Sequence, residues 1–188
     1  MKTFNPENKA HWREWLEENH VKEDSVWLEF FRKGSPNYNL SWSDAVDEAL
    51  CFGWIDSTKR KVDDEKYIQY FCKRKPKSNW SRVNKEKVKT LTEQGLMQEA
   101  GLESIKIAKE NGSWSFLDAV EALMIPAELK EELDKHEGAA TFFDNLSKSD
   151  KKILLYWVIS AKTEKTRQKR ILEIARNASQ SCKPKQFG

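Results

Sequence analysis

The side chains best suited to chemistry lie within about thirty residues in the first half of the chain. Asp56 is a carboxylate at the expected junction of a helix and a strand, where it could act as an acid or a base. Lys73 and Arg74 could bind an anion, and Trp54 and Trp80 offer planar surfaces for stacking. This combination is compatible with a catalytic site or with a non-enzymatic anion-binding site.

Two further cations, Arg167 and Arg170, lie three residues apart on the last expected helix. Their guanidinium groups could hold an anion in a fork, or could pair with a carboxylate within the fold. For Asp56 the simpler interpretation is an ion pair with Arg74, Arg167 or Arg170. A shared anion pocket would require both late arginines to converge on Lys73 and Arg74.

The tryptophans allow two interpretations. Indole rings beside cations can stack on bases, but tryptophans in a small domain most often pack in the core. We expect Trp54 and Trp114 to be core residues. Trp80 follows a basic run and has Asn79 and Ser81 beside it, so we expect it to be exposed. No RNA-binding signature accompanies these residues, so nucleic acid is not the expected partner, and weak nucleic-acid binding remains a third, weaker function hypothesis.

The sequence contains no recognisable metal or cofactor motif. His11, His20 and His136 are scattered and lack metal-ligand spacing, and no glycine-rich phosphate loop is present. We therefore expect no metal and no cofactor.

The three cysteines, Cys51, Cys72 and Cys182, are far apart, which argues against a disulfide framework. Cys51 is expected to be inert. Cys72 could have a lowered pKa beside the basic run, or could be an ordinary strand residue.

Composition places the chain among folded proteins of modest size. Its 188 residues include eight tryptophans and nine phenylalanines, which can form one sizeable core or two smaller ones. The first residues contain no apolar run typical of a secretory signal, and no segment is apolar enough to span a membrane. We expect a cytoplasmic location.

The net charge of +3 is unevenly distributed. Residues 56–90 carry 12 basic and 5 acidic side chains, and residues 161–188 carry 8 and 2. The two basic segments could form one positive face for an acidic protein or a small anion, or they could pair with the acidic segments.

The periodicity predicts an α+β fold that is mostly helical. A helix is expected over residues 7–19, a strand over 25–33, and a helix capped by Ser43 and ended by Gly53. Extended segments from Ile55 and from Tyr67 to Lys73 complete a small antiparallel sheet of about three strands in the N-terminal half.

Helical periodicity dominates after Pro76. Ser115 with Asp118 resembles a capping box, Ser149 and Thr163 are further expected caps, and helices are expected near 139–146, 150–160 and 164–178. We place the domain boundary near Ile125, with an α+β domain over 1–124 and a helical domain over 125–188.

Four phrases carry a resemblance to a known family. They are Ala-Leu-Cys-Phe-Gly-Trp-Ile-Asp at 49–56, Lys-Arg-Lys-Pro-Lys-Ser-Asn-Trp-Ser at 73–81 with Asn84, Gly-Leu-Met at 95–97 with Ala100 and Gly101, and Ala-Lys-Thr-Glu-Lys-Thr-Arg at 161–167 with Arg170. In this order they resemble the YdeI/OmpD-associated family, also called the bacteriocin-protection or OmdA-type family. The resemblance implies association with an outer-membrane porin and tolerance of bacteriocins. It implies no catalytic residue set. For some members it also implies a periplasmic location, and from the first residues we expect this chain to depart from that.

Two hypotheses follow. The first is a non-enzymatic binding or stress-protection protein with a basic aromatic cleft for an anionic ligand or acidic partner, involving Trp54, Asp56, Lys73, Arg74, Trp80, Arg167 and Arg170. The second is an enzyme in which Asp56 is the acid or base and Arg74 or Arg170 is an electrostatic clamp. The absence of a catalytic signature favours the first.

Overall fold

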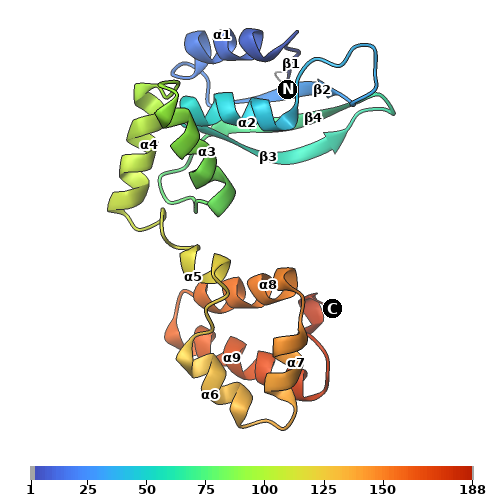
Figure 1. Ribbon diagram of the computed structural model, residues 1–188, viewed down its shortest axis with the longest axis vertical. Coiled ribbons are helices and arrows are strands. Elements are labelled where there is room, and N and C mark those ends of the chain that lie inside the picture. Colours follow the sequence, from blue (N-terminus) through green and yellow to red (C-terminus); the bar gives the residue numbers. More distant parts are fainter. Residues whose placement is uncertain (1–2, 188) are drawn as a thin grey trace. The chain divides into compact units, whose positions relative to one another are not determined.

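The computed structural model describes residues 3–187, which form two compact units. The first unit ends at Phe116 and the second begins at Leu117. The expected α+β class is confirmed, because a small sheet with helices is followed by helices alone (Figure 1). The boundary expected near Ile125 falls later in the chain than this division, and Val120 and Leu123 already pack in the core of the second unit.

The sheet of the first unit has four strands among the described residues, one more than expected. They are β1 (Thr3–Phe4), β2 (Ser25–Phe31), β3 (Trp54–Lys61) and β4 (Lys66–Lys73), in the order β1-β2-β4-β3. β1 pairs in parallel with β2, and the other pairs are antiparallel. The additional strand has two residues, too few to show the alternation by which a strand is recognised in sequence.

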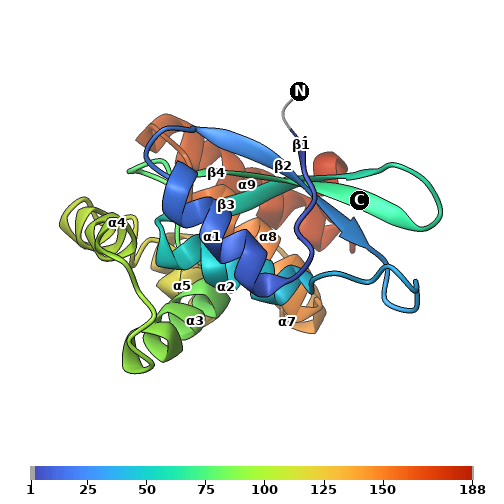
Figure 2. The same ribbon diagram turned by 90° about the horizontal axis from the view of Figure 1, so that it is seen from above.

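Helices α1 (Lys9–Asn19) and α2 (Trp42–Cys51) cover one face of this sheet (Figure 2). That face carries Val26 and Phe71, which are paired across β2 and β4 and are buried. Trp12 of α1 contacts the Phe71 ring and donates its Nε1–H to the Ala45 carbonyl of α2 at 3.0 Å. A buried indole with a satisfied donor thus links both helices to the sheet.

The cap of α2 is Ser41 rather than the expected Ser43. The Ser41 hydroxyl accepts a hydrogen bond from the backbone N–H of Asp44 at 3.0 Å. The same Ser-x-Ser-Asp order recurs at residues 147–150, where the first serine again caps the helix and the expected Ser149 does not. In both places the serine three residues before the aspartate has the reach that a cap requires.

Two more helices complete the first unit, α3 (Arg82–Glu93) and α4 (Glu99–Glu110). Val88 and Leu91 of α3 and Ile105 of α4 are buried in the same core as the helix-covered face of the sheet. Gly95 separates the two helices with a φ of +68°, a conformation that glycine adopts readily.

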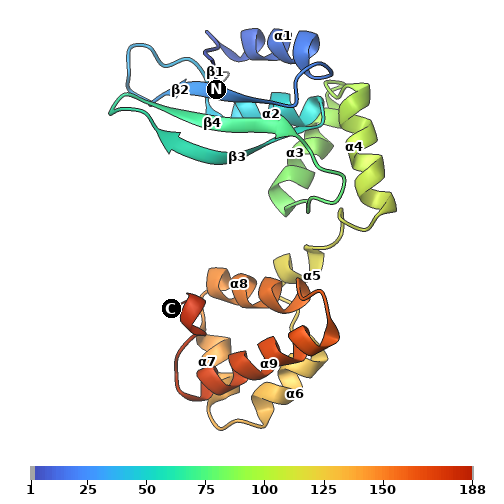
Figure 3. The same ribbon diagram turned by 180° about the vertical axis from the view of Figure 1, so that it is seen from behind.

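The second unit consists of α5 (Asp118–Glu121), α6 (Ala127–Asp134), α7 (Ala139–Asn145), α8 (Lys148–Ile159), α9 (Glu164–Ser179) and the short 3₁₀ turn η1 (Lys185–Phe187). α9 packs against α6, α7 and α8 around a core that includes Phe143 and Ile174 (Figure 3).

In this unit the expected cap is found at the start of α9, whereas the caps expected for α5 and α8 are not. Thr163 caps α9 as expected, but the capping box expected at Ser115 is wrong, because α5 begins after Leu117 without a side-chain cap. Within residues 3–187 no helix is both long and apolar enough to cross a bilayer.

Candidate anion-binding site

The segment after β4 passes between the end of the sheet and the end of α4. The backbone N–H of Arg74 donates to the Gly53 carbonyl at 2.9 Å, at the junction of α2 and β3. The Pro76 carbonyl accepts from Asn111 Nδ2 at 2.7 Å and from Ser113 Oγ at 3.3 Å. These bonds hold the loop that begins at Arg74 in place. In the sequence, this loop is recognisable only as a run of basic residues.

Arg74 is the most unusual polar residue of this loop. Its guanidinium lies over the Trp80 ring, 3.7 Å from the centroid, and its Nη2 donates to the Asn79 carbonyl at 2.6 Å. Nε and Nη1 are buried and have no hydrogen-bond partner among the described residues. An unsatisfied buried donor costs about 1–3 kcal/mol, and more when it is charged.

Burial also changes the acidity of this guanidinium. Desolvation lowers the pKa of Arg74 to about 10, and electrostatic interactions, first with Asp56 and then with Cys72, oppose that shift. The positive charge is therefore held in an environment that disfavours it. An anion in contact with the guanidinium would reverse that effect.

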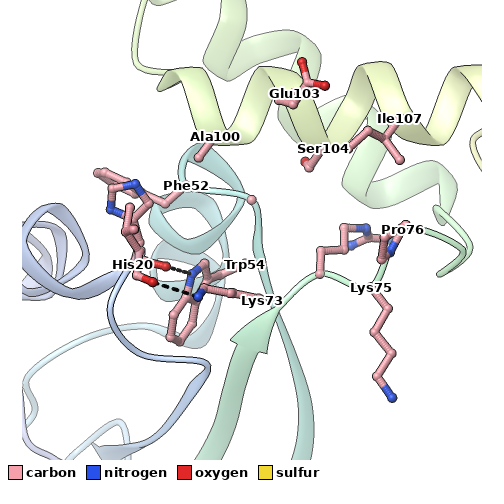
Figure 4. A pocket seen from close by; sticks show the side chains of 13 residues that line it. His20, Phe52, Trp54, Lys73, Lys75, Pro76, Ala100, Glu103, Ser104 and Ile107 are labelled. Carbon is pink, nitrogen blue, oxygen red and sulfur yellow. Dashed lines mark hydrogen bonds between the residues drawn. The ribbon is translucent and has the colours of Figure 1, made fainter.

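Arg74 lines a pocket of about 360 Å³ that is otherwise largely apolar. One side comes from the loop and the sheet end, and the other from α4 (Figure 4). The lining residues are His20, Val21, Phe52, Gly53, Trp54, Lys73, Arg74, Lys75, Pro76, Ala100, Glu103, Ser104 and Ile107. A mainly apolar concavity with a few polar groups is the usual form of a small-molecule site.

Two glycines bring α4 close enough to form this pocket. A Cβ on Gly101 would lie 2.3 Å from the Cys51 carbonyl oxygen, and one on Gly53 would lie 2.8 Å from the Ala100 carbonyl oxygen. The backbones of α2 and α4 therefore touch directly. Gly101 lies inside a helix, where glycine is unfavourable, and this was the one sequence signal that α4 makes a close contact.

The predicted residues Trp54 and Lys73 lie on the sheet side of the pocket. Trp54 is buried in the core as expected, and its Nε1 donates to the His20 carbonyl at 3.4 Å. The Lys73 ammonium donates to the Val21 carbonyl at 2.9 Å and pairs with Asp24 at 3.0 Å; the bonds to His20 and Val21 are the dashed lines of Figure 4. Through these bonds both side chains attach the end of the sheet to the segment that follows α1, beside the pocket.

The expectation that Trp80 is exposed is wrong. Only 1% of Trp80 is exposed, because its ring lies between the Arg74 guanidinium and Trp114, whose ring centroid is 5.0 Å away. Trp114 packs against the core, as expected. Trp114 is 34 residues distant from Trp80 in sequence, so the neighbouring residues Asn79 and Ser81 gave no sign that Trp80 is buried.

Asp56 is half-buried on the helix-covered face of the sheet and does not line the pocket. Its Oδ2 accepts hydrogen bonds from Trp42 Nε1 and Gln69 Nε2, both at 2.9 Å. Within the described part of the chain it forms no ion pair with an arginine, in contrast to the expected pairing. Asp56 therefore connects α2 to the sheet.

Arg167 and Arg170 belong to the second unit and have partners there. Arg167 Nη2 pairs with Glu128 at 3.2 Å, and its Nε is buried without a described partner. Arg170 Nη1 donates to the Trp157 carbonyl and to Ser160 Oγ at 3.2 Å. Pairing within the fold accounts for these contacts.

The two cysteines of the first unit, Cys51 and Cys72, are not activated. Burial raises the pKa of Cys51 to about 11, with the Glu48 charge adding to the effect. Burial also raises the pKa of Cys72, so the alternative of a lowered pKa beside the basic run is wrong. Across residues 3–187, no three His, Cys, Asp or Glu side chains gather in a way that could hold a metal ion.

Of the lining residues, sequence reasoning placed only Trp54, Lys73 and Arg74 in the site; the residues that it missed include Phe52, Pro76, Ser104 and Ile107. Phe52 and Pro76 stand within quoted phrases but carry no functional group that marks a site. Ser104 and Ile107 follow Gly101 on α4, and only the contact of α4 with α2 places them here.

Comparison with known families gives matches to two successive segments of the chain. Residues 4–104 match a family described as a domain of unknown function, DUF8412. Residues 122–181 match the family described as bacteriocin-protection, YdeI or OmpD-associated (OmdA). Neither the curated proteins nor the solved structures contain a match to the chain.

The four phrases of the sequence are divided between the two matches. The phrase at 161–167 lies in the OmdA match, whereas the phrases at 49–56, 73–81 and 95–97 lie in the first match, together with the whole pocket apart from Ile107. The chain thus belongs to the DUF8412 family, and the segment after this match is similar to the YdeI/OmpD-associated family.

Proposed function

We propose that the first unit is a non-enzymatic binding module for a small anionic ligand, with Arg74 as the residue that contacts the anion. The observation that carries this proposal is the pair of buried Arg74 donors without acceptors, in a residue that lines a largely apolar pocket. An anion would supply acceptors and compensate the desolvated charge.

A small ligand suits the pocket better than an acidic protein partner. The volume of about 360 Å³ lies near the lower end of the range for small-molecule sites, about 300–1,000 Å³. A protein partner would contact exposed cations such as Lys75 and Lys77, whereas the Arg74 donors without acceptors are buried and are suited to a small ligand inside the pocket.

The enzymatic alternative has less support. Asp56, its proposed acid or base, uses one carboxylate oxygen to hold Trp42 and Gln69 and does not line the pocket. A general acid or base must reach the bound substrate. We therefore retain binding as the function that the geometry favours.

The description of the second family suggests the setting in which such binding is used. That family is named for bacteriocin protection and association with OmpD. We propose that the chain contributes to bacteriocin protection and that ligand binding by the first unit supports this role. Cells that depend on the protein for protection should then lose it when Arg74 is replaced by methionine.

The binding proposal is tested by thermal shift with benzoate, hexanoate and inorganic phosphate. At least one anion should raise the Tm of the wild-type first unit, measured in the full chain, because a ligand that binds only the folded state stabilises it. Arg74→Met keeps the apolar stem over Trp80 and removes the charge, so the shift should disappear.

The matched control is Lys77→Met, which removes an exposed cation of the same loop that does not line the pocket. This variant should keep the full ligand-induced shift. An equal shift in wild type and Arg74→Met, or no shift with any of the three anions, would refute the proposal.

A further inference from the structure

We propose that the ligand of this pocket is a monocarboxylate with a flat apolar body, such as an aromatic carboxylic acid. This inference rests on the proposed function and specifies its ligand class. It follows from the number of charges that face the pocket and from the nature of the remaining lining.

The charge that faces the pocket is small. The Lys73 ammonium is occupied by Val21 and Asp24. Figure 4 shows the Lys75 side chain extending away from α4 and the Glu103 carboxylate directed away from the pocket, and Glu103 also pairs with Lys106 at 3.5 Å. Lys75 forms no ion pair among the described residues, but its side chain leaves the pocket. The Arg74 guanidinium is therefore the lining cation that has buried donors without acceptors and is not directed away from the pocket.

A single guanidinium matches a single carboxylate. Nε and Nη1, the Arg74 nitrogens without acceptors, lie on opposite edges of the planar guanidinium, and Nη2 belongs to both edges. Nη2 uses one N–H for the Asn79 carbonyl, so its second N–H can complete a two-donor fork for a carboxylate on one edge. A phosphate dianion carries about twice that charge and is usually held by several cations or by a loop of backbone amides. The pocket lining supplies neither, so the charge balance favours a monoanion.

The remaining lining favours an apolar body. Phe52, Trp54 and Pro76 contribute rings on one side, and Ile107 contributes an aliphatic side chain from α4. Ser104 is the hydroxyl on that helix, and its Oγ already donates to the Gly101 carbonyl at 2.8 Å. A ligand body rich in hydroxyl groups would find few partners here, whereas a flat hydrocarbon ring would bury its surface against these side chains.

The test compares 2-naphthoate, acetate and inorganic phosphate by isothermal titration calorimetry on the full chain. We expect 2-naphthoate to bind at least about tenfold more tightly than acetate or phosphate, because only naphthoate has an apolar body to bury. Arg74→Met should weaken naphthoate binding by about tenfold or more, the loss expected for a charge-assisted hydrogen bond. Ile107→Asn should also weaken it, and Lys77→Met should leave it unchanged.

The outcomes separate the ligand class from the proposed function. If phosphate binds most tightly and Arg74→Met abolishes its binding, the monocarboxylate inference is wrong and anion binding at Arg74 stands. If Arg74→Met leaves the binding of every probe unchanged, both are wrong. Should Arg74→Met fail to fold, Arg74→Lys serves instead, and it should weaken naphthoate binding because it keeps the charge but loses the fork.

Discussion

At the scale of single residues, stacking explains the dense mixture of aromatic rings and cations in the first unit. Arg74 lies over Trp80, Arg60 over Trp27 at 4.6 Å, and Lys59 over Tyr67 at 3.9 Å. In each pair the cation lies over the face of the aromatic ring, where its positive charge is attracted to the π-electrons. Arg74 differs from the other two because two of its nitrogens are also buried without acceptors.

The acidity of Arg74 predicts how ligand binding changes with pH. Its pKa is lowered to about 10 by burial, so the guanidinium is charged at neutral pH and loses its proton as the pH rises through that value. A carboxylate ligand is ionised throughout this range. The affinity for 2-naphthoate should therefore be constant near neutral pH and fall by about tenfold per pH unit above about 10.

Calorimetry from neutral to alkaline pH checks this dependence, with circular dichroism at each pH to confirm that the fold persists. Arg74→Met provides the control, since its weak residual binding should not show the same fall. An affinity that stays constant well above pH 10 would mean that the charge of Arg74 does not hold the ligand.

At the scale of elements, the pocket depends on the direct contact between α2 and α4. Gly101 permits this contact, and Ala100, Ser104 and Ile107 on α4 reach the pocket because of it. The helix starts were partly predictable, because a capping Ser, Thr or Asp accepts a hydrogen bond from a backbone N–H only two or three residues away. The contact between α2 and α4 was not, because about fifty residues separate the two backbones that touch.

Gly101→Ala should therefore destabilise the first unit although alanine is the better helix former. Alanine gains about 1 kcal/mol of helix propensity. The added Cβ would lie 2.3 Å from the Cys51 carbonyl oxygen, a backbone atom that cannot rotate away, and overpacking of this kind costs about 1–3 kcal/mol or more. We expect a net loss of about 1–2 kcal/mol in the free energy of unfolding, and weaker naphthoate binding.

Urea denaturation followed by tryptophan fluorescence measures this loss. Leu102→Ala, at an exposed position on the same helix, is the matched control and should change stability by less than about 0.5 kcal/mol. A Gly101→Ala protein that is as stable as wild type and binds naphthoate equally would show that the close contact does not shape the pocket.

At the scale of the whole molecule, the chain has two separate hydrophobic cores. One contains Trp12, Phe71 and Trp80, and the other contains Phe143, Leu155 and Ile174. The pocket belongs to the first of these units, and Arg167 and Arg170 belong to the second. The sequence-based site grouped residues of both units, because residue type alone does not indicate which core a side chain joins.

Separate cores predict separate responses to core mutations. Phe143→Ala removes a fully buried ring and should destabilise the second unit by about 3–5 kcal/mol. Hydrogen exchange should show faster exchange in residues 117–187 and unchanged protection of β2 and β4, while calorimetry should show unchanged naphthoate affinity. A loss of naphthoate binding in this variant would contradict the assignment of the site to the first unit alone, and Phe143→Leu should give a smaller effect of the same kind.

The sequence by itself determined the fold class, the order of the helices and strands apart from β1, and the absence of a familiar catalytic motif, because periodicity and caps depend on residues a few positions apart. It also supplied Trp54, Lys73, Arg74 and Trp80 as residues of interest, three of which line the pocket. The tertiary structure alone decided that Trp80 is buried, that Asp56 contacts Trp42 and Gln69, and that α4 closes the pocket beside Arg74. These outcomes depend on packing between segments distant in sequence, and no local pattern encodes which surfaces will meet.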